Sequence, residues 1–335
     1  MGVRMSDVSV VICGYTEDRW DRIVGAVASL RCQTVPPQEI IFVSDHNPAL
    51  LERAEQHLDA DIIVANTGTR GLSDARNTGV KMAKGSKIAF LDDDAEAAPN
   101  WIEHLSRWCE QPDVIGAGSR VDPVWANKKP NWFPEEFYWT VGCSYVGMPT
   151  SSAQVRNPFG GAMCVSREIF DRVGGFRVGI GRVDNMLAGC EETELCIRAN
   201  ERWPQKSFIY EPEAVIMHYL PKNREKLSYF LRRCFHEGRS KALLSKVVDH
   251  RAALQAETSY VLRVLPRGAL RNVIHSITNF EMSGLLRSGT IVLGLGTVGL
   301  GYVVGLRNAF LIQRPPKNNS QDTIINEEQA GHDTL

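Results

Sequence analysis

Short apolar runs alternate with amphipathic segments along the first third of the chain. Four runs are rich in β-branched residues, which is typical of buried parallel strands: Val8 to Cys13, Glu39 to Ser44, Asp61 to Ala65 and Ser86 to Leu91. Between them the polar and apolar spacing predicts three helices: Arg19 to Gln33, a second opening at Asn47-Pro48, and Ser73 to Lys84. Strand and helix in alternation predict an α/β protein with a doubly wound sheet.

Acidic residues follow two of these predicted strands. Asp45 ends one of them, and Asp92-Asp93-Asp94 ends another, at the sheet edge where ligands of doubly wound folds bind. Asp45 alone is most simply a solvated turn residue. The triplet is different, because two unit charges ~4 Å apart repel by about 4 kcal/mol at an effective dielectric of 20. A divalent cation with oxygen ligands relieves such repulsion.

Composition narrows the functional classes. The chain has 335 residues, 43% of them hydrophobic and 23% charged, which is enough for a sizeable core and roughly two domains. Lys plus Arg (38) and Asp plus Glu (39) nearly cancel, so no overall field recruits nucleic acid. Eight cysteines without a Cys-x-x-Cys pair argue against a zinc site or a disulfide framework and fit reduced thiols in a cytosolic compartment.

Four stretches carry a resemblance to a known family: VSVVICGYTEDRW, EIIFVSDHNP, GLSDARNTGVKMAKGSKIAFLDDD and GCEETELCIRA. In this order and spacing, over roughly residues 8 to 220, they resemble the motifs of family-2 glycosyltransferases. TEDRW, WFPEEF and CEETELCIRA further resemble the branch with archaeal dolichyl-phosphate-linked glucuronosyltransferases and uncharacterised actinobacterial and cyanobacterial relatives. The resemblance implies a GT-A fold, which is a Rossmann-like, mostly parallel sheet flanked by helices, here with a C-terminal helical extension.

The resemblance also implies the donor side of an active site. Asp92 and Asp94 match the family's Asp-x-Asp motif, which holds Mn²⁺ or Mg²⁺ and the ribose of a nucleotide sugar, with UDP favoured. Asp94 is expected to bind the metal directly, and Asp93 lies between the two. His218 is either a further ligand or a structural histidine. The rest of the donor site is expected at Cys13, Gly14, Tyr15, Thr16, Asp45 and Arg76.

The acceptor side is expected further along the chain, at Gly160 and Gly161. In the family the second residue of an acidic pair is the catalytic base of an inverting transfer, and Glu192 takes that position here. Glu191 stays an alternative, and both carboxylates would also suit a helix N-terminus. Arg232, Arg233 and Arg239 either bind phosphate or lipid head groups or form the wet face of a helix. The aromatic block from Trp125 to Trp139 is either a sugar-stacking wall or core packing.

The C-terminal part changes character. Residues 289–306 carry no charge and sit at the lower length limit of a membrane span. They predict a membrane-associated hairpin or single span, or else a buried helix of a soluble domain. Gly301-x-x-x-Gly305 suits close helix packing. Gly294-x-Gly296-x-x-Gly299 is a dinucleotide-binding pattern that favours an NAD-dependent oxidoreductase, although no strand and helix units follow it.

Together these features predict a domain organisation and a function. A catalytic domain is expected over residues 1–222, a helical region over 223–283, an apolar segment over 284–312 and a disordered tail over 313–335. The predicted enzyme transfers a sugar to a saccharide or lipid-linked saccharide, in the cytoplasm or at the cytoplasmic side of a membrane. A catalytically inactive sugar-binding protein is the remaining alternative, and the oligomeric state is not predicted. Met1 to Ser6 also match a myristoylation pattern.

Overall fold

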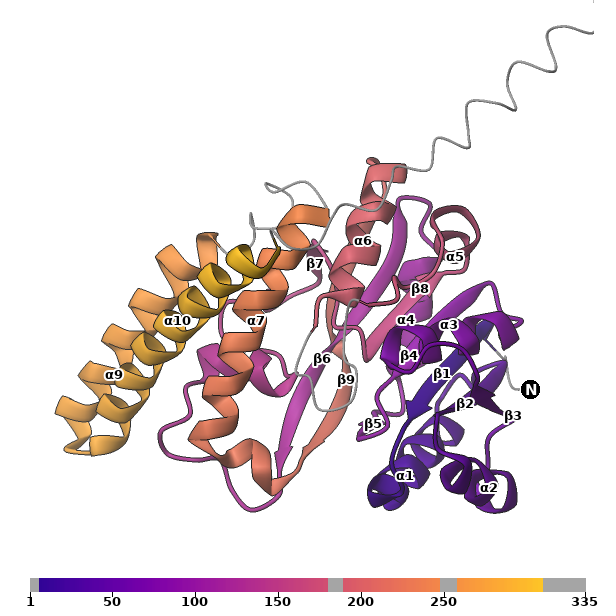
Figure 1. Ribbon diagram of the computed structural model, residues 1–335, viewed down its shortest axis with the longest axis horizontal. Helices are drawn as coiled ribbons and strands as arrows, with labels where there is room; N and C mark the ends of the chain where they lie inside the picture. The colour runs from indigo at the N-terminus through magenta and orange to yellow at the C-terminus, as the bar shows by residue number, and fades with distance from the viewer. Residues whose placement is uncertain (1–5, 180–188, 248–257, 310–335) are drawn as a thin grey trace, which may run out of the picture.

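The computed structural model describes residues 6–179, 189–247 and 258–309, and in this part of the chain it contains one nine-stranded sheet (Figure 1). The N-terminal half of the sheet is parallel, in the order β3-β2-β1-β4. Its strands are β1 (Val8–Gly14), β2 (Glu39–Asp45), β3 (Ile62–Asn66) and β4 (Lys87–Leu91). The intervening helices are α1 (Trp20–Arg31), α2 (Pro48–His57) and α3 (Leu72–Met82). Every predicted element of this half is therefore confirmed within two residues.

The other half of the sheet is mixed. β8 (Ala162–Ser166) pairs antiparallel with β4 and with β6 (Val114–Trp125). β9 (Ser207–Leu220) runs parallel to β6 and also pairs antiparallel with two short strands, β5 (Ala95–Ala97) and β7 (Ala153–Val155). The helices of this half are α4 (Trp101–Cys109), α5 (Glu168–Val173) and α6 (Glu191–Arg202). The parallel arrangement expected from the sequence thus holds for the first half. The next strand in the sheet, β8, runs in the opposite direction to both of its neighbours.

The central strands are buried on both faces, which explains their uninterrupted apolar sequences. Successive residues of β1 point to opposite sides of the sheet. Val10 and Ile12 pack in the cluster that contains Ile23, Val27 and Leu30 of α1. Val11 packs in the other cluster, with residues of α3 and α6. The sheet therefore has a helical layer on each face, and its carboxyl edge is left open for a site.

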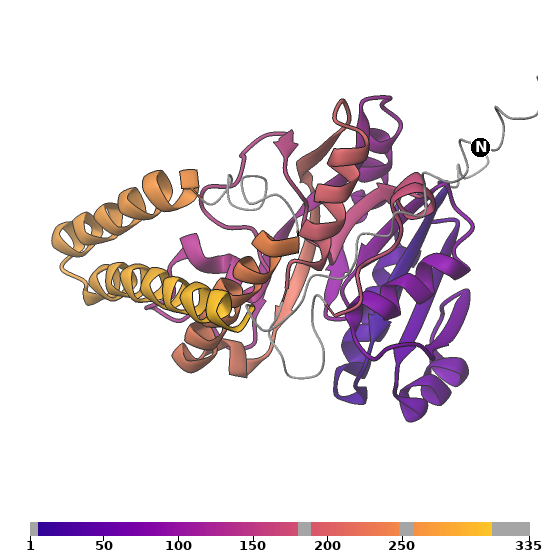
Figure 2. The same cartoon turned by 45° about the horizontal axis from the view of Figure 1, so that its top comes forward.

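Three long helices follow β9: α7 (Leu227–Val247), α9 (Leu265–Asn279) and α10 (Met282–Ala309). Helices α9 and α10 form an antiparallel hairpin at the end of the molecule farthest from β3 and α2 (Figures 1 and 2). The dinucleotide pattern Gly294 to Gly299 lies inside the continuous helix α10. A dinucleotide fingerprint needs a turn between a strand and a helix, so the structural basis of the oxidoreductase alternative is absent there.

Four shorter helical segments complete the described fold: η1 (Glu17–Arg19), η2 (Glu135–Val141), η3 (Lys222–Glu225) and η4 (Tyr260–Val264). η1 follows β1, and η3 follows β9. The two segments therefore follow strands that lie in different halves of the sheet.

Glycines set the distance between α7 and α10. A Cβ atom on Gly301 would lie 2.1 Å from the carbonyl oxygen of Phe235, and one on Gly238 would lie 2.0 Å from that of Val298. Gly305 faces Ala242 and the backbone of Arg239. The close helix contact expected from Gly301-x-x-x-Gly305 is thus present, and the partner is α7 of the same chain.

We predict that Gly301→Ala forces α7 and α10 apart and lowers the free energy of unfolding by about 1–3 kcal/mol, the usual effect of overpacking. Gly296→Ala is the matched control in the same helix, because a Cβ there meets no heavy atom within 4 Å. Alanine at 296 is expected to stabilise the helix by about 0.5–1 kcal/mol. Thermal unfolding of both purified variants measures the difference, and shifts of the same sign and size would contradict the packing described here.

Candidate active site

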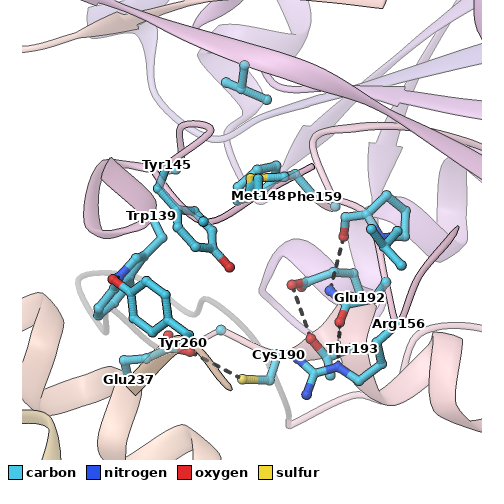
Figure 3. A pocket seen from close by; sticks show the side chains of 18 of the residues that line it. Trp139, Tyr145, Met148, Arg156, Phe159, Cys190, Glu192, Thr193, Glu237 and Tyr260 are labelled. Carbon is cyan, nitrogen blue, oxygen red and sulfur yellow. Dashed lines mark hydrogen bonds between the residues drawn. The ribbon is translucent and has the colours of Figure 1, made fainter. Parts of the chain in front are cut away.

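A cavity of about 770 Å³ lies between the sheet and the C-terminal helices. Its polar end is lined by Arg76, Asp92, Glu191, Glu192 and His218. Its other end is lined by aromatic and aliphatic side chains of η2, η4 and α10 and of the segment after η2, among them Phe137, Trp139, Tyr145, Tyr260, Val261, Leu295, Val298 and Tyr302. In Figure 3, Trp139, Tyr145 and Tyr260 lie together on one side, and Glu192, Thr193 and Arg156 lie on the other.

The acidic triplet directly follows β4, and arginines from distant parts of the chain neutralise it. Nη1 of Arg19 lies 2.6 Å from Asp93 Oδ1 and 3.3 Å from Asp94 Oδ2. Nη2 of Arg224 lies 3.3 Å from Asp94 Oδ2, and Nη2 of Arg76 lies 3.5 Å from Asp92 Oδ1. The relief of repulsion that the sequence assigned to a cation is therefore supplied in large part by Arg19, Arg224 and Arg76.

Asp93 and Asp94 respond differently to the same surroundings. Burial raises the pKa of Asp93 to about 6, against the opposing effect of Arg19, and its Oδ2 has no hydrogen-bond partner among the described residues. Burial would also raise the pKa of Asp94, but His218, Arg224 and Arg19 hold that pKa well below its usual value. Asp94 is therefore the firmly ionised member of the pair.

Asp92, Asp94 and His218 form a group that fits a divalent metal ion. One ligand atom from each lies within 4.8 Å of the others, and Nε2 of His218 is 3.0 Å from Asp94 Oδ1. The Asp92 side chain is 36% exposed and lines the cavity, so the group is open toward a ligand. Carboxylate and imidazole donors suit Mn²⁺. His218 lies within β9, opposite Ala95 of β5.

Two neighbouring glutamates begin α6 and occupy distinct environments. Oε1 of Glu191 is 3.3 Å from Nη1 of Arg76, while its buried Oε2 has no hydrogen-bond partner among the described residues. Glu192 lines the cavity, and burial together with the charge of Glu191 raises its pKa to about 7. A carboxylate with a pKa near neutrality is suited to accept a proton. Glu191 is therefore held against Arg76, and Glu192 is the carboxyl of the two with a raised pKa.

Two glycines allow the strand β8 to approach these side chains. A Cβ atom on Gly161 would lie 2.0 Å from the carboxyl carbon of Asp92, and one on Gly160 would lie 2.9 Å from Nη1 of Arg76 and 3.2 Å from the Cβ of Glu192. Any larger residue at 161 would displace Asp92. Gly160 and Gly161, which were expected at the acceptor side, thus line the cavity together with Asp92 and Glu192.

The remaining residues expected at the donor side lie beyond the cavity, at the ends of β1 and β2. Cys13 and Gly14 end β1, Tyr15 is exposed, and the Thr16 hydroxyl accepts a hydrogen bond from the backbone of Asp18. Asp45 accepts hydrogen bonds from Asn66 Nδ2 (2.8 Å) and from the backbone N–H of Gly71 (2.9 Å). Asp45 therefore anchors the loop before α3.

The arginines of α7 separate into two groups. Arg233 is buried, lines the cavity and pairs with Glu237 at 2.9 Å. Arg232 and Arg239 are exposed and line no part of it. Of the alternatives expected for these arginines, phosphate binding in the cavity fits the position of Arg233, whereas Arg232 and Arg239 lie on the exposed face of the helix.

The aromatic block from Trp125 to Trp139 lies partly in the core and partly at the cavity. Phe133 and Phe137 are fully buried, and Trp125 stacks edge to face on Phe133 with ring centroids 5.2 Å apart. Phe137 and Trp139 also line the cavity. The first part of the block is core packing, and its end is cavity wall.

Sequence reasoning missed three charged residues of the site. Arg19 lies inside the quoted TEDRW motif, so its motif membership was a usable signal. Arg224 reaches Asp94 across 130 positions, and no spacing rule connects such distant partners. Glu237 lies four positions from both Arg233 and Lys241 on α7, so the i,i+4 spacing of a helix was a usable signal for its pairing.

Known protein families and solved structures include proteins similar to this chain. Residues 9–174 match the family model described as glycosyl transferase family 2. The chain is 31% identical over 314 residues to the glucosyl-dolichyl phosphate glucuronosyltransferase of Haloferax volcanii, a match that covers 92% of this chain and 98% of that protein.

Two solved structures are similar in fold. The mannosyltransferase PcManGT from Pyrobaculum calidifontis, in complex with GDP-Man and Mn²⁺, has a TM-score of 0.55 at 18% identity and covers 93% of this chain and 88% of its own. GalNAc-T7 with UDP, GalNAc and Mn²⁺ has a TM-score of 0.51 at 17% identity over 82% and 58%. Both are GT-A folds. The chain therefore belongs to glycosyl transferase family 2 and is a glycosyltransferase with the GT-A fold.

Proposed function

We propose that this glycosyltransferase moves a sugar from a UDP-sugar to a hydroxyl group of a lipid-linked saccharide, with inversion at the anomeric carbon. The observation that carries the proposal is that Asp92, His218 and Glu192 line the same cavity. Metal ligands on the donor side and a base on the acceptor side must meet across one anomeric carbon for a direct displacement. The name of the relative from Haloferax volcanii, which specifies glucosyl-dolichyl phosphate, supports a lipid-linked acceptor.

In the proposed reaction, Glu192 takes the proton from the acceptor hydroxyl. The hydroxyl oxygen forms a bond to the anomeric carbon, the bond from that carbon to the diphosphate oxygen breaks, and the nucleoside diphosphate leaves with its electron pair. Attack from the face opposite the leaving group inverts the configuration. Arg76, which is held by Glu191 and Asp92, supplies a fixed positive charge on the donor side.

We propose Asp92, Asp94 and His218 as the residues that hold a divalent metal, Mn²⁺ or Mg²⁺. When bound, such an ion stabilises negative charge that develops on a diphosphate leaving group. The structural support is the donor set itself, which faces the cavity through Asp92. Asp45, together with residues 13–16 at the end of β1, is proposed to contact the nucleoside.

We predict that Glu192→Gln lowers kcat by about 10²–10⁴-fold, the usual contribution of a general base, while UDP-sugar binding is retained. Because the pKa of Glu192 is raised to about 7, the carboxylate is protonated and inactive at lower pH. The wild-type kcat/KM should therefore rise tenfold per pH unit below about 7 and level off above it. A transfer assay across pH with a UDP-sugar and a glycosyl lipid measures both effects.

Glu201→Gln is the control for this experiment, since Glu201 is an exposed acid in the last turn of the same helix. Its activity should match that of the wild type. Near-full turnover by Glu192→Gln would contradict the assigned base. A wild-type pH profile that is flat through 7 would do the same.

We further propose that the α9–α10 hairpin embeds its outer face in a membrane surface. Within the described residues, Met282–Arg307 is the segment long and apolar enough to cross a membrane, and 28% of its apolar window is buried. Its inner side packs on α7, a helix with several charged residues. This packing favours the hairpin reading over a full span. Exposed apolar residues cover the hairpin: Leu270, Ile274, Ile277, Phe280, Met282, Leu286, Val292 and Leu300.

We predict that the double variant Ile277→Asp, Phe280→Asp weakens binding to liposomes by about tenfold or more, because it places two charges where the hairpin would meet acyl chains. Phe280 is 96% exposed at φ 52°, a left-handed conformation that aspartate tolerates. Co-flotation with phospholipid vesicles measures binding. Val24→Asp is the control, because Val24 is an exposed apolar residue of the distant helix α1. Equal flotation of the double variant and the wild type would contradict the membrane proposal.

A further inference from the structure

The cavity extends well past the proposed catalytic groups. The residues expected to hold the nucleotide, from Cys13 to Thr16 and Asp45, do not line it. Asp92 and Arg76 line its donor-side edge, and from there it runs to η4 and α10. Its volume of about 770 Å³ is in the upper part of the range typical of ligand sites. Most of this space is therefore available to the acceptor.

Three cationic side chains also line the cavity. Arg233 and Lys241 project from α7, and Arg156 follows β7. Glu237 pairs with the two residues of α7, its Oε2 2.9 Å from Arg233 Nη1 and its Oε1 3.7 Å from Lys241 Nζ. Burial would raise the pKa of Glu237, but Arg233, Lys241 and Arg156 keep it below its usual value. These four residues, here named the Glu237 cluster, thus hold guanidinium and ammonium groups in fixed positions.

The Glu237 cluster lies beside the proposed base. Sγ of Cys190 is 4.0 Å from Oε1 of Glu237, and a Cβ atom on Gly189 would lie 3.3 Å from Nη2 of Arg233. Cys190 immediately precedes the two glutamates of α6, and the charge of Glu237 contributes to the raised pKa of Glu192. An anion bound to the Glu237 cluster would therefore lie near Glu192, the proposed base for the acceptor hydroxyl.

Beyond the cluster the cavity wall is apolar and continues onto the proposed membrane face. Leu295, Val298 and Tyr302 of α10 line the cavity. Val292 and Leu300 of the same helix are exposed apolar residues. Helix α10 thus presents apolar residues both to the cavity and to the proposed membrane face.

We propose that the cavity binds a glycosyl phosphate lipid in one orientation, with the acceptor sugar at Glu192, the phosphate at the Glu237 cluster and the first part of the lipid chain against η4 and α10. This inference rests on the proposed function and adds to it the residues that recognise the phosphate. Guanidinium and ammonium groups are the usual partners of phosphate oxygens. Arg156, Arg233 and Lys241 are then acceptor-specificity residues that take no part in the proton transfer.

The test compares acceptors that share one sugar. The first is a glucosyl phosphate with a medium-length isoprenoid chain, the second is an uncharged alkyl glucoside of the same chain length, and the third is glucose 1-phosphate. Wild-type KM is expected to be lowest for the first. Lys241→Gln should raise KM for the phosphate-bearing lipid by about tenfold or more, as expected for the loss of one hydrogen bond to a charged group, and leave KM for the alkyl glucoside unchanged.

A second variant, Arg233→Gln with Glu237→Gln, removes the buried ion pair as a unit and leaves no uncompensated charge. It should show the same selective increase in KM. Arg232→Gln, one position away on the exposed face of α7, is the matched control and should leave both KM values unchanged. The ratio of the two KM values within one preparation does not depend on the fraction of folded enzyme.

Each remaining outcome bears on a different claim. An equal rise in KM for the charged and the uncharged lipid would overturn the phosphate assignment while leaving the proposed function intact. A loss that appears with a UDP-uronate donor but not with UDP-glucose, for every acceptor, would assign the cluster to the donor's carboxylate and would also overturn it. No transfer by the wild type from any UDP-sugar to any of the three acceptors would overturn the proposed function itself.

Discussion

The site depends on the burial of acidic side chains at the end of β4 against arginines from elsewhere in the chain. Asp93 and Asp94 are almost fully buried, and two adjacent buried carboxylates are unstable without compensating charge. Arg19 and Arg224 provide that charge from η1 and η3. η1 follows β1 and η3 follows β9, so the two halves of the sheet are joined electrostatically at the same place where the ligand atoms of Asp92, Asp94 and His218 gather.

Neighbouring residues of each acidic group have different electrostatic surroundings. Asp94 is held ionised by Arg19, Arg224 and the neighbouring His218, whereas Asp93 has a raised pKa and one oxygen without a hydrogen-bond partner among the described residues. Both glutamates line the cavity, but Glu191 is paired with Arg76, whereas Glu192 has a pKa near 7. In each pair one carboxyl has a raised pKa, Asp93 or Glu192, while its neighbour is held by an arginine. Paired carboxylates with separated pKa values are a recurrent feature of active sites.

Much of the fold could be predicted from the sequence because its strands are buried on both faces and its helices have clear boundaries. The Asn47-Pro48 start of α2 and the apolar face of α1 follow from local rules alone. The antiparallel strand β8 could not be derived in this way, since strand direction depends on pairing with distant strands. Glu192, Asp92 and Arg76 were recognisable from family motifs. Arg224 was not, because its partner Asp94 is defined only by the folded chain, whereas the i,i+4 spacing of Glu237 from Arg233 and Lys241 was a local signal.

The most direct test of the central claim is binding of Mn²⁺ to the purified protein in the presence of UDP, followed by electron paramagnetic resonance. Asp92→Asn is the appropriate variant, because Asp92 is the candidate ligand least involved in the buried ion pairs. The account predicts saturable Mn²⁺ binding by the wild type and a loss of affinity of tenfold or more in the variant, with unchanged thermal stability. Identical Mn²⁺ affinity in both proteins would contradict it.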